Sequence, residues 1–214
     1  MEKEKVWTYI DHTLLRPTAA WEEIRTLCDE AVAHKAASVC VPPAFVSRIH
    51  EIYGAALVIC TVIGFPLGYQ TAGVKSVETA EAVAAGAGEV DMVINLGDAK
   101  DGKFKEITRE IALLKAAAQG RILKVIVETC YLSQDEKIAL CECVTQGGAD
   151  YIKTSTGFGS AGAALEDVTL FKKYIGPDVK IKAAGGISTL EQFLGFIEAG
   201  CGRIGTSRAM QVLG

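Results

Sequence analysis

An eightfold alternation of two kinds of segment runs through the 214 residues and most constrains the fold. Short apolar runs rich in β-branched residues, typical of buried strands, alternate with longer Ala-, Leu-, Glu- and Lys-rich stretches of helical period. The expected strands span residues 8–11, 38–41, 57–62, 89–94, 122–127, 151–153, 179–183 and 203–205. The expected helices span residues 19–34, 43–53, 71–85, 103–118, 133–146, 164–174, 189–198 and 207–212. This order of segments predicts the α/β class.

Eight strands, each followed by a helix, predict a (β/α)8 TIM barrel that takes up residues 1–214 as a single domain. An open doubly wound sheet is the alternative, but no Gly-x-Gly-x-x-Gly motif follows the first expected strand. The strand ends that contain glycine also cluster late in the chain, at Gly157, Gly185, Gly186 and Gly205. Barrels commonly bind phosphate at this position.

Composition excludes several classes of partner. The formal net charge is -4 and no run of Lys or Arg occurs, so we expect no nucleic-acid partner. No apolar run reaches about 18 residues, so we expect no transmembrane helix and no membrane partner. Seven cysteines occur without the spacing of a disulfide framework, which is typical of reduced thiols in a cytoplasmic protein.

Two lysines lie at neighbouring strand ends among apolar residues. Lys153 closes the sixth expected strand and Lys182 lies near the end of the seventh, each beside a glycine-containing turn. A nearby cation and partial desolvation lower the pKa of an amine, and a neutral amine attacks carbonyl groups to form a Schiff base. The alternative is that each lysine only extends to solvent from its strand end. Two such lysines on adjacent strands favour carbonyl chemistry.

Strand alternation also places Asp91 and Lys124 inside the expected barrel, because the other face of both strands is apolar. Two interpretations stay open: a general acid or base near the Schiff base, or a structural ion pair. Asp11, at the end of the first strand, is expected to bind a substrate hydroxyl, to hold a lysine, or to cap the next helix.

Polar and glycine residues at the last three strand ends predict a phosphate cradle. Glycines let backbone N–H groups approach an anion, and a hydroxyl adds a further donor. We also expect Ser207 to cap the last helix. The expected phosphate ligands are Thr156, Gly157, Gly185, Gly186 and Ser207.

Together these segments resemble the deoxyribose-phosphate aldolase family of class I aldolases over nearly the whole chain. The segments that carry the resemblance are IDHTLL at 10–15, TVIGFPLG at 61–68, EVDMVIN at 89–95, KVIVET at 124–129, KTSTGF at 153–158 and KAAGGI at 182–187. The resemblance implies reversible cleavage of 2-deoxy-D-ribose 5-phosphate to D-glyceraldehyde 3-phosphate and acetaldehyde, in deoxyribose phosphate catabolism. It also implies a homo-oligomer, either dimer or tetramer, and neither a metal nor another cofactor, because the iminium itself takes up the electrons.

By the same resemblance, Lys153 is the Schiff-base lysine, Lys182 keeps its pKa low, and Asp91 moves protons through water. Lys124 and Asp11 complete the polar network. Some family members have a lysine where this chain has Phe158, so we expect backbone N–H groups, with Arg208, to hold the phosphate. Some also end in a tail that carries a tyrosine; here the last tyrosine is Tyr174, so water takes that step or the tail lies beyond this sequence.

Three other functions remain open at this point. Another Schiff-base aldolase, such as a transaldolase-like enzyme, would use a longer donor than acetaldehyde. A phosphate-binding barrel isomerase or synthase would use Lys153 only in ion pairs, and a sugar-phosphate binder would bind without turnover. Borohydride trapping and substrate assays separate these cases.

Overall fold

Eight parallel strands close into one barrel in the computed structural model, which describes residues 1–214. They pair in chain order, and the ring is closed where β1 pairs with β8. The strands are β1 Ile10–Thr13, β2 Ser38–Val41, β3 Ile59–Ile63, β4 Glu89–Val93, β5 Ile122–Ile126, β6 Tyr151–Lys153, β7 Lys180–Ala184 and β8 Arg203–Thr206. The prediction of a (β/α)8 barrel is therefore confirmed.

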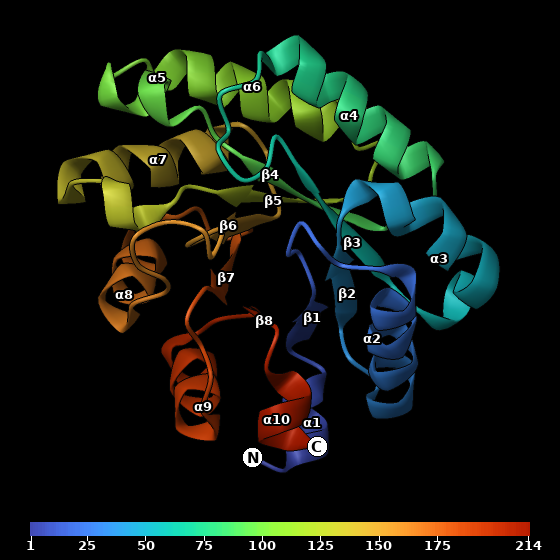
Figure 1. The fold of residues 1–214 in the computed structure, drawn as a ribbon. Coiled ribbons are helices and arrows are strands. Elements are labelled where there is room, and N and C mark those ends of the chain that lie inside the picture. Colours follow the sequence, from blue (N-terminus) through green and yellow to red (C-terminus); the bar gives the residue numbers. More distant parts are fainter.

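Helices surround the barrel on its outside (Figure 1). The first and last helices lie together, so both chain ends meet on one side of the molecule (Figure 1). The helices are α1 Lys3–Trp7, α2 Trp21–His34, α3 Val46–Tyr53, α4 Ala72–Ala84, α5 Leu96–Lys100, α6 Phe104–Ala117, α7 Gln134–Gln146, α8 Leu165–Tyr174, α9 Leu190–Ala199 and α10 Ala209–Leu213. Short 3-10 turns occupy η1 Pro43–Phe45, η2 Gly54–Ala56 and η3 Thr129–Tyr131.

Some expected boundaries are wrong, each for a local reason. The first strand begins at Ile10 rather than at residue 8, because α1 ends with Thr8 as its C-cap. The last helix begins only at Ala209, and its N-cap is Arg208, which makes no side-chain capping bond. The hydroxyl of Thr206 instead accepts from the Arg208 N–H at 3.0 Å. The expectation that Ser207 caps this helix is therefore wrong.

The period-two alternation of the strands separates an apolar layer from a charged interior. Val90 and Met92 of β4 and Leu123 and Val125 of β5 are fully buried in the apolar core. This core fills the space between barrel and helices, as parallel sheets require. Several of the intervening inward positions carry charged side chains, which meet inside the barrel. Burial of the outer layer therefore fixes which residues face the interior.

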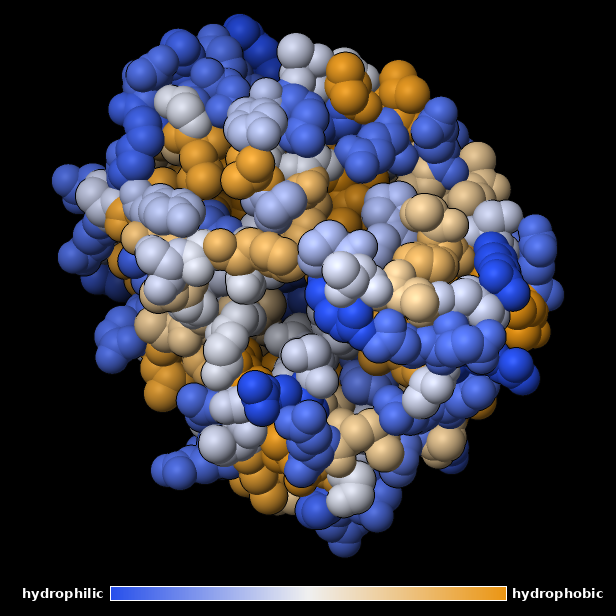
Figure 2. Space-filling view, in the orientation of Figure 1, coloured by the Kyte–Doolittle hydropathy of each residue, from blue (hydrophilic) through white to orange (hydrophobic).

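The surface in the orientation of Figure 1 is mostly hydrophilic, with hydrophobic residues in separate areas (Figure 2). It is hollowed near its centre, over the strands of the barrel (Figure 2). None of the helices combines the length and the apolar character that crossing a membrane requires.

Candidate active site

Asp91 lies at the centre of the barrel interior, where three lysines bond to its carboxylate. The Nζ atoms of Lys153 and Lys182 share Oδ2, at 2.7 Å and 2.6 Å, and Nζ of Lys124 lies 2.9 Å from Oδ1. All four side chains are buried. Burial raises the pKa of Asp91, but the three ammonium groups outweigh it and hold the pKa well below its usual range. Asp91 is therefore ionised and accepts hydrogen bonds from all three lysines.

The strand register explains why these side chains meet. Asp91 and Lys124 are direct partners across β4 and β5, and Lys153 and Lys182 are direct partners across β6 and β7. Adjacent strands lie about 4.8 Å apart, which long lysine side chains span easily. The expectation from sequence that the two lysine amines lie close to each other is therefore met.

Lys182 is held between two carboxylates. Its Nζ lies 2.5 Å from Oδ2 of Asp11 as well as 2.6 Å from Asp91. Burial lowers the pKa of Lys182, but Asp11 and Asp91 outweigh this effect and raise the pKa above its ordinary value. Lys182 is therefore a fixed cation beside Lys153. Of the three roles open to Asp11, the structure shows that of holding a lysine.

Lys124 is a second fixed cation, on the opposite side of Asp91. Its Nζ lies 2.6 Å from Oε2 of Glu89, and the Cys60 thiol donates to Asp91 Oδ1 at 3.1 Å. Burial lowers the pKa of Lys124, but Asp91 and the other nearby acidic groups raise it well above its usual value. The structural ion pair weighed from sequence is thus present, and the same carboxylate also contacts Lys153.

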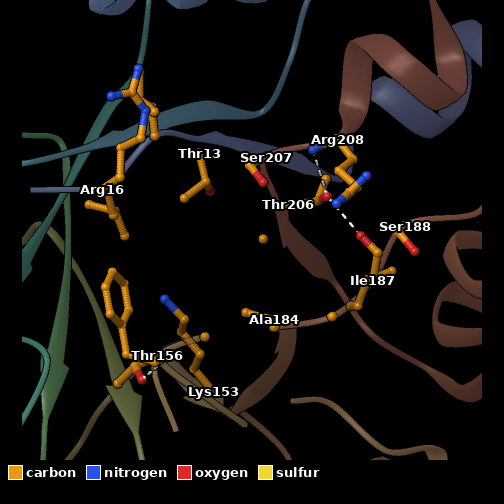
Figure 3. A pocket seen from close by; sticks show the side chains of 17 residues that line it. Thr13, Arg16, Lys153, Thr156, Ala184, Ile187, Ser188, Thr206, Ser207 and Arg208 are labelled. Atoms are coloured by element: carbon orange, nitrogen blue, oxygen red, sulfur yellow. Dashed lines mark hydrogen bonds between the residues drawn. The ribbon is translucent and has the colours of Figure 1, made fainter. Parts of the chain in front are cut away.

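Lys153 reaches from the buried charges into a cavity of about 520 Å³. In Figure 3 its amine points into open space, with Thr13 and Ser207 across from it. The cavity opens at the carboxyl ends of the strands, which is where barrel enzymes bind their substrates. The size suits a small organic substrate. Lys153 thus has the free approach that a nucleophile needs.

The far side of this cavity is lined by backbone N–H groups without acceptors. Four residues line the cavity with backbone N–H groups that donate no intramolecular hydrogen bond: Gly157, Gly185, Gly186 and Ser207. Gly185 has φ +87°, and a Cβ there would lie only 3.0 Å from Cα of Gly162. Two loops therefore pack backbone to backbone, and their free donors favour an anion.

Thr156 lines the cavity, but both of its donor groups bond to a buried neighbour. Its hydroxyl and its N–H both donate to the carboxylate of Glu128, and its oxygen accepts from the N–H of Phe158 at 3.0 Å. Glu128 forms no ion pair with any of the lysines. In this structure Thr156 therefore anchors the loop after β6 and does not present its hydroxyl to the cavity.

Side chains at the mouth of the cavity differ in character from side to side. Phe158 packs edge to face on Phe65, with ring centroids 5.4 Å apart, and stays half exposed. Arg208 lines the other side, and its guanidinium donates only to Oε1 of Gln211, at 3.2 Å. The guanidinium of Arg16 points away from the cavity (Figure 3). Arg208 thus lines the same cavity as the glycine loops, and its proposed contact with a phosphate stays a prediction.

Two charged residues of the interior are missing from the site expected from sequence. Arg203, the first residue of β8, donates to both oxygens of Glu89, at 2.7 Å and 2.9 Å, and to Asp11 at 2.6 Å. Glu89 lies two residues before Asp91, so strand alternation already places it on the same face. Arg203 carries the same signal, because it precedes Gly205 by two residues on a strand with an apolar outer face.

Potential metal ligands occur only where lysines already bind. The ligand atoms of Cys40, Cys60 and Asp91 lie within 4.8 Å of one another, as do those of Asp11, Cys60 and Glu89. All three carboxylates accept from buried ammonium or guanidinium groups. A cation placed here would face these positive charges directly, so the donor set suits the lysines rather than a metal.

Comparison with known proteins agrees with this geometry. Residues 5–207 match the family described as DeoC/LacD family aldolase. A Clostridium botulinum protein named deoxyribose-phosphate aldolase is 55% identical over 213 residues, which cover 100% of this chain and 96% of that protein.

Two solved structures share the fold at high similarity. The aldolase QR15 has a TM-score of 0.93 at 39% identity and covers 97% of this chain and 94% of its own. A tetrameric deoxyribose phosphate aldolase from Aeropyrum pernix has a TM-score of 0.89 at 31% identity, with 99% and 91% covered. With a lysine-rich barrel interior open to a cavity lined by free backbone N–H groups, and with relatives of this similarity, the chain belongs to the DeoC/LacD family of aldolases.

Proposed function

We propose that this protein is a deoxyribose-phosphate aldolase, which reversibly cleaves 2-deoxy-D-ribose 5-phosphate to D-glyceraldehyde 3-phosphate and acetaldehyde. One observation carries the proposal: the amine of Lys153 lies in a cavity, shares an oxygen of Asp91 with Lys182, and faces free backbone donors. The amine suits an aldehyde carbon and the donors suit a phosphate. The names of relatives at 52–55% identity support the same substrate.

Lys153 is the nucleophile in this proposal. The lone pair of its neutral Nζ forms a bond to C1 of the open-chain sugar, and the carbonyl oxygen takes up a proton. Loss of that oxygen as water leaves an iminium on Lys153. Lys182, a buried cation that touches the same carboxylate oxygen, supplies the positive field and a proton for the departing oxygen.

Asp91 moves the proton for carbon–carbon cleavage. It is ionised, so it accepts the proton of the C3 hydroxyl through water as the C2–C3 bond breaks. The bonding electrons pass into the iminium, D-glyceraldehyde 3-phosphate leaves, and an enamine remains on Lys153. Return of the proton to C2 restores an iminium, and water releases acetaldehyde and the free amine.

The glycine loops hold the phosphate end of the substrate. The free N–H groups of Gly157, Gly185, Gly186 and Ser207 donate to its oxygens, and Arg208 adds a cation. Phosphate binding at this end orients the chain of the sugar toward Lys153 and fixes which carbon meets the amine. Thr156 contributes by fixing the loop through Glu128.

A turnover assay tests the proposal. The enzyme with 2-deoxy-D-ribose 5-phosphate should release D-glyceraldehyde 3-phosphate and acetaldehyde in equal amounts. A transaldolase-like enzyme would instead transfer a longer donor and would release no acetaldehyde. An isomerase would convert the sugar phosphate without cleaving it, and a binding protein would leave it unchanged. Any of these last three results would contradict the proposed reaction.

We also propose that residues 1–214 act as one domain, in a cytoplasmic homo-oligomer, dimer or tetramer, without a nucleic-acid or membrane partner. The seven free cysteines support a reducing compartment. The tetramer of the Aeropyrum pernix relative and exposed apolar residues such as Val74 and Val77 support assembly. Light scattering of the purified protein measures the assembly directly, and a monomer at micromolar concentration would contradict it.

A further inference from the structure

The charged groups inside the barrel form one continuous network. From Arg203, contacts of 2.6 Å to Asp11, 2.5 Å from Asp11 to Lys182, 2.6 Å from Lys182 to Asp91 and 2.7 Å from Asp91 to Lys153 run without a break. Glu89 joins the network through Arg203 and Lys124. The members are three acids and four bases: Asp11, Glu89, Asp91, Lys124, Lys153, Lys182 and Arg203.

Other titratable groups that face this space carry no fixed charge. β2 and β3 contribute the thiols of Cys40 and Cys60, and β6 contributes the phenol of Tyr151, whose ring lies 5.9 Å from the Arg203 guanidinium. Burial raises the pKa of Cys60 and of Tyr151, so both stay neutral. The hydrogen bond from Cys60 lowers the pKa of Cys40, so its thiol needs a control in the experiment.

Charged side chains beyond the network have their own partners or are exposed, as is Lys180 of β7, whose Nζ lies 5.8 Å from the Tyr151 ring. Glu128, at the end of β5, is bonded to Thr156. At the mouth, Arg16 pairs with Glu23 and Arg208 bonds to Gln211. The formal charges inside the barrel are therefore those of the seven network residues alone.

The balance of this count depends on Lys153. With Lys153 protonated, four cations face three carboxylates, and the buried network carries an excess positive charge. With Lys153 as a free amine, three cations face three carboxylates and the excess disappears. An uncompensated buried charge is far more costly than a neutral polar group. The network is therefore balanced in the state that attacks a carbonyl.

We propose that Arg203 and Glu89, which do not contact the substrate cavity, are positioning residues that set this balance and thereby the pH at which Lys153 becomes a nucleophile. The inference rests on the proposed function, because it needs Lys153 to form the Schiff base. It goes beyond a pairwise effect of Lys182, whose charge is already met by Asp11 and Asp91. What acts on Lys153 is the sum over the interior, and Arg203 contributes one full charge to it.

Two substitutions change the sum in opposite directions. Arg203→Met leaves the carboxylates in excess, so Lys153 keeps its proton and reacts only at higher pH. Glu89→Gln leaves the cations in excess, so Lys153 reacts at lower pH. Removing one unit charge from the same barrel interior, at an effective dielectric of about 20, moves the pH midpoint of Schiff-base formation by about one pH unit or more. The double variant restores the count and should return the midpoint to that of the wild type.

The experiment measures the pH midpoint of Schiff-base formation. Each protein is mixed briefly with acetaldehyde at a series of pH values and quenched with borohydride, which delivers hydride to the iminium carbon and leaves an ethyl group on Nζ. Mass spectrometry then gives the modified fraction. The series is repeated with Cys40→Ser, which removes a titrating thiol. Lys115→Met, which breaks a part-exposed ion pair with Asp150 outside the barrel, is the matched control and should leave the midpoint unchanged.

Arg203→Lys keeps the charge and should leave the pH midpoint of Schiff-base formation unchanged. If Arg203→Met does not fold, Arg203→Lys and Glu89→Gln together test the inference. Shifts in the same direction, or no shift in Glu89→Gln, overturn the inference. A double variant that behaves like either single one overturns it as well. Absence of trapping in the wild type at every pH overturns the proposed function itself, whereas trapping without opposed shifts overturns only the charge balance.

Discussion

Asp91→Asn separates the chemistry of the central carboxylate from its part in holding the fold. The substitution keeps the shape of a side chain that lies 2.6–2.9 Å from three lysine nitrogens, but it removes the charge and the proton acceptor. Loss of a general acid or base lowers turnover by about 10²–10⁴, or roughly 3–5 kcal/mol of barrier. Schiff-base trapping should persist, because removing a carboxylate makes the interior more positive and favours the free amine of Lys153.

The cost in stability is expected to be smaller than that of breaking an isolated buried pair, about 3–5 kcal/mol. Lys182 keeps Asp11, and Lys124 keeps Glu89, so neither is left unpaired. The assay combines turnover of 2-deoxy-D-ribose 5-phosphate, trapping with acetaldehyde, and urea unfolding. Unchanged turnover would refute the proton-transfer role. Joint loss of trapping and stability would show that Asp91 is mainly the structural partner of Lys124.

Three other substitutions probe the charged network and the cavity. Lys182→Leu removes a cation and should move the pH midpoint of Schiff-base trapping upward. Lys180→Leu, which truncates an exposed lysine of the same strand, should leave the midpoint unchanged. Equal pH profiles for Lys182→Leu and the wild type would contradict an electrostatic effect of Lys182 on Lys153. Neighbouring cations hold the pKa of Asp11 below its usual value, so its contribution to stability is complete above about pH 4 and is lost as the pH falls further. In Asp11→Asn, the free energy of unfolding measured with urea should therefore fall less steeply below about pH 4 than in the wild type. An equally steep fall would argue against this role of Asp11. Phe158→Lys should lower KM for the phosphorylated sugar about two- to fivefold at low salt and should leave KM for 2-deoxyribose unchanged. A lower KM for both sugars would mean that the new lysine does not bind phosphate.

The barrel and most of its charged interior follow from local pattern. Strands with an apolar outer face must turn their other residues inward, which places Asp91 and Lys124 together without any knowledge of the tertiary structure. The apolar runs at 38–41 and 151–153 have the same bounds in sequence and structure, because turn and glycine residues flank them closely.

Elements that depend on distant contacts could not be predicted in this way. The helix α1 has only five residues, too few to be stable alone, and is held by burial of Trp7, whose ring stacks on His34 at 4.7 Å. Arg203 pairs with Asp11 across 192 positions of sequence, so its role appears only when β8 closes on β1. The partner of Thr156 was equally hidden, because Glu128 reaches it from the end of another strand.

Peptide mapping after borohydride reduction with acetaldehyde tests the covalent step at Lys153. We predict an ethyl group on Lys153 and on no other lysine, and neither modification nor turnover in a folded Lys153→Ala protein. An ethyl group mapped mainly to Lys182, Lys124 or Lys180, or trapping that survives in Lys153→Ala, would contradict it.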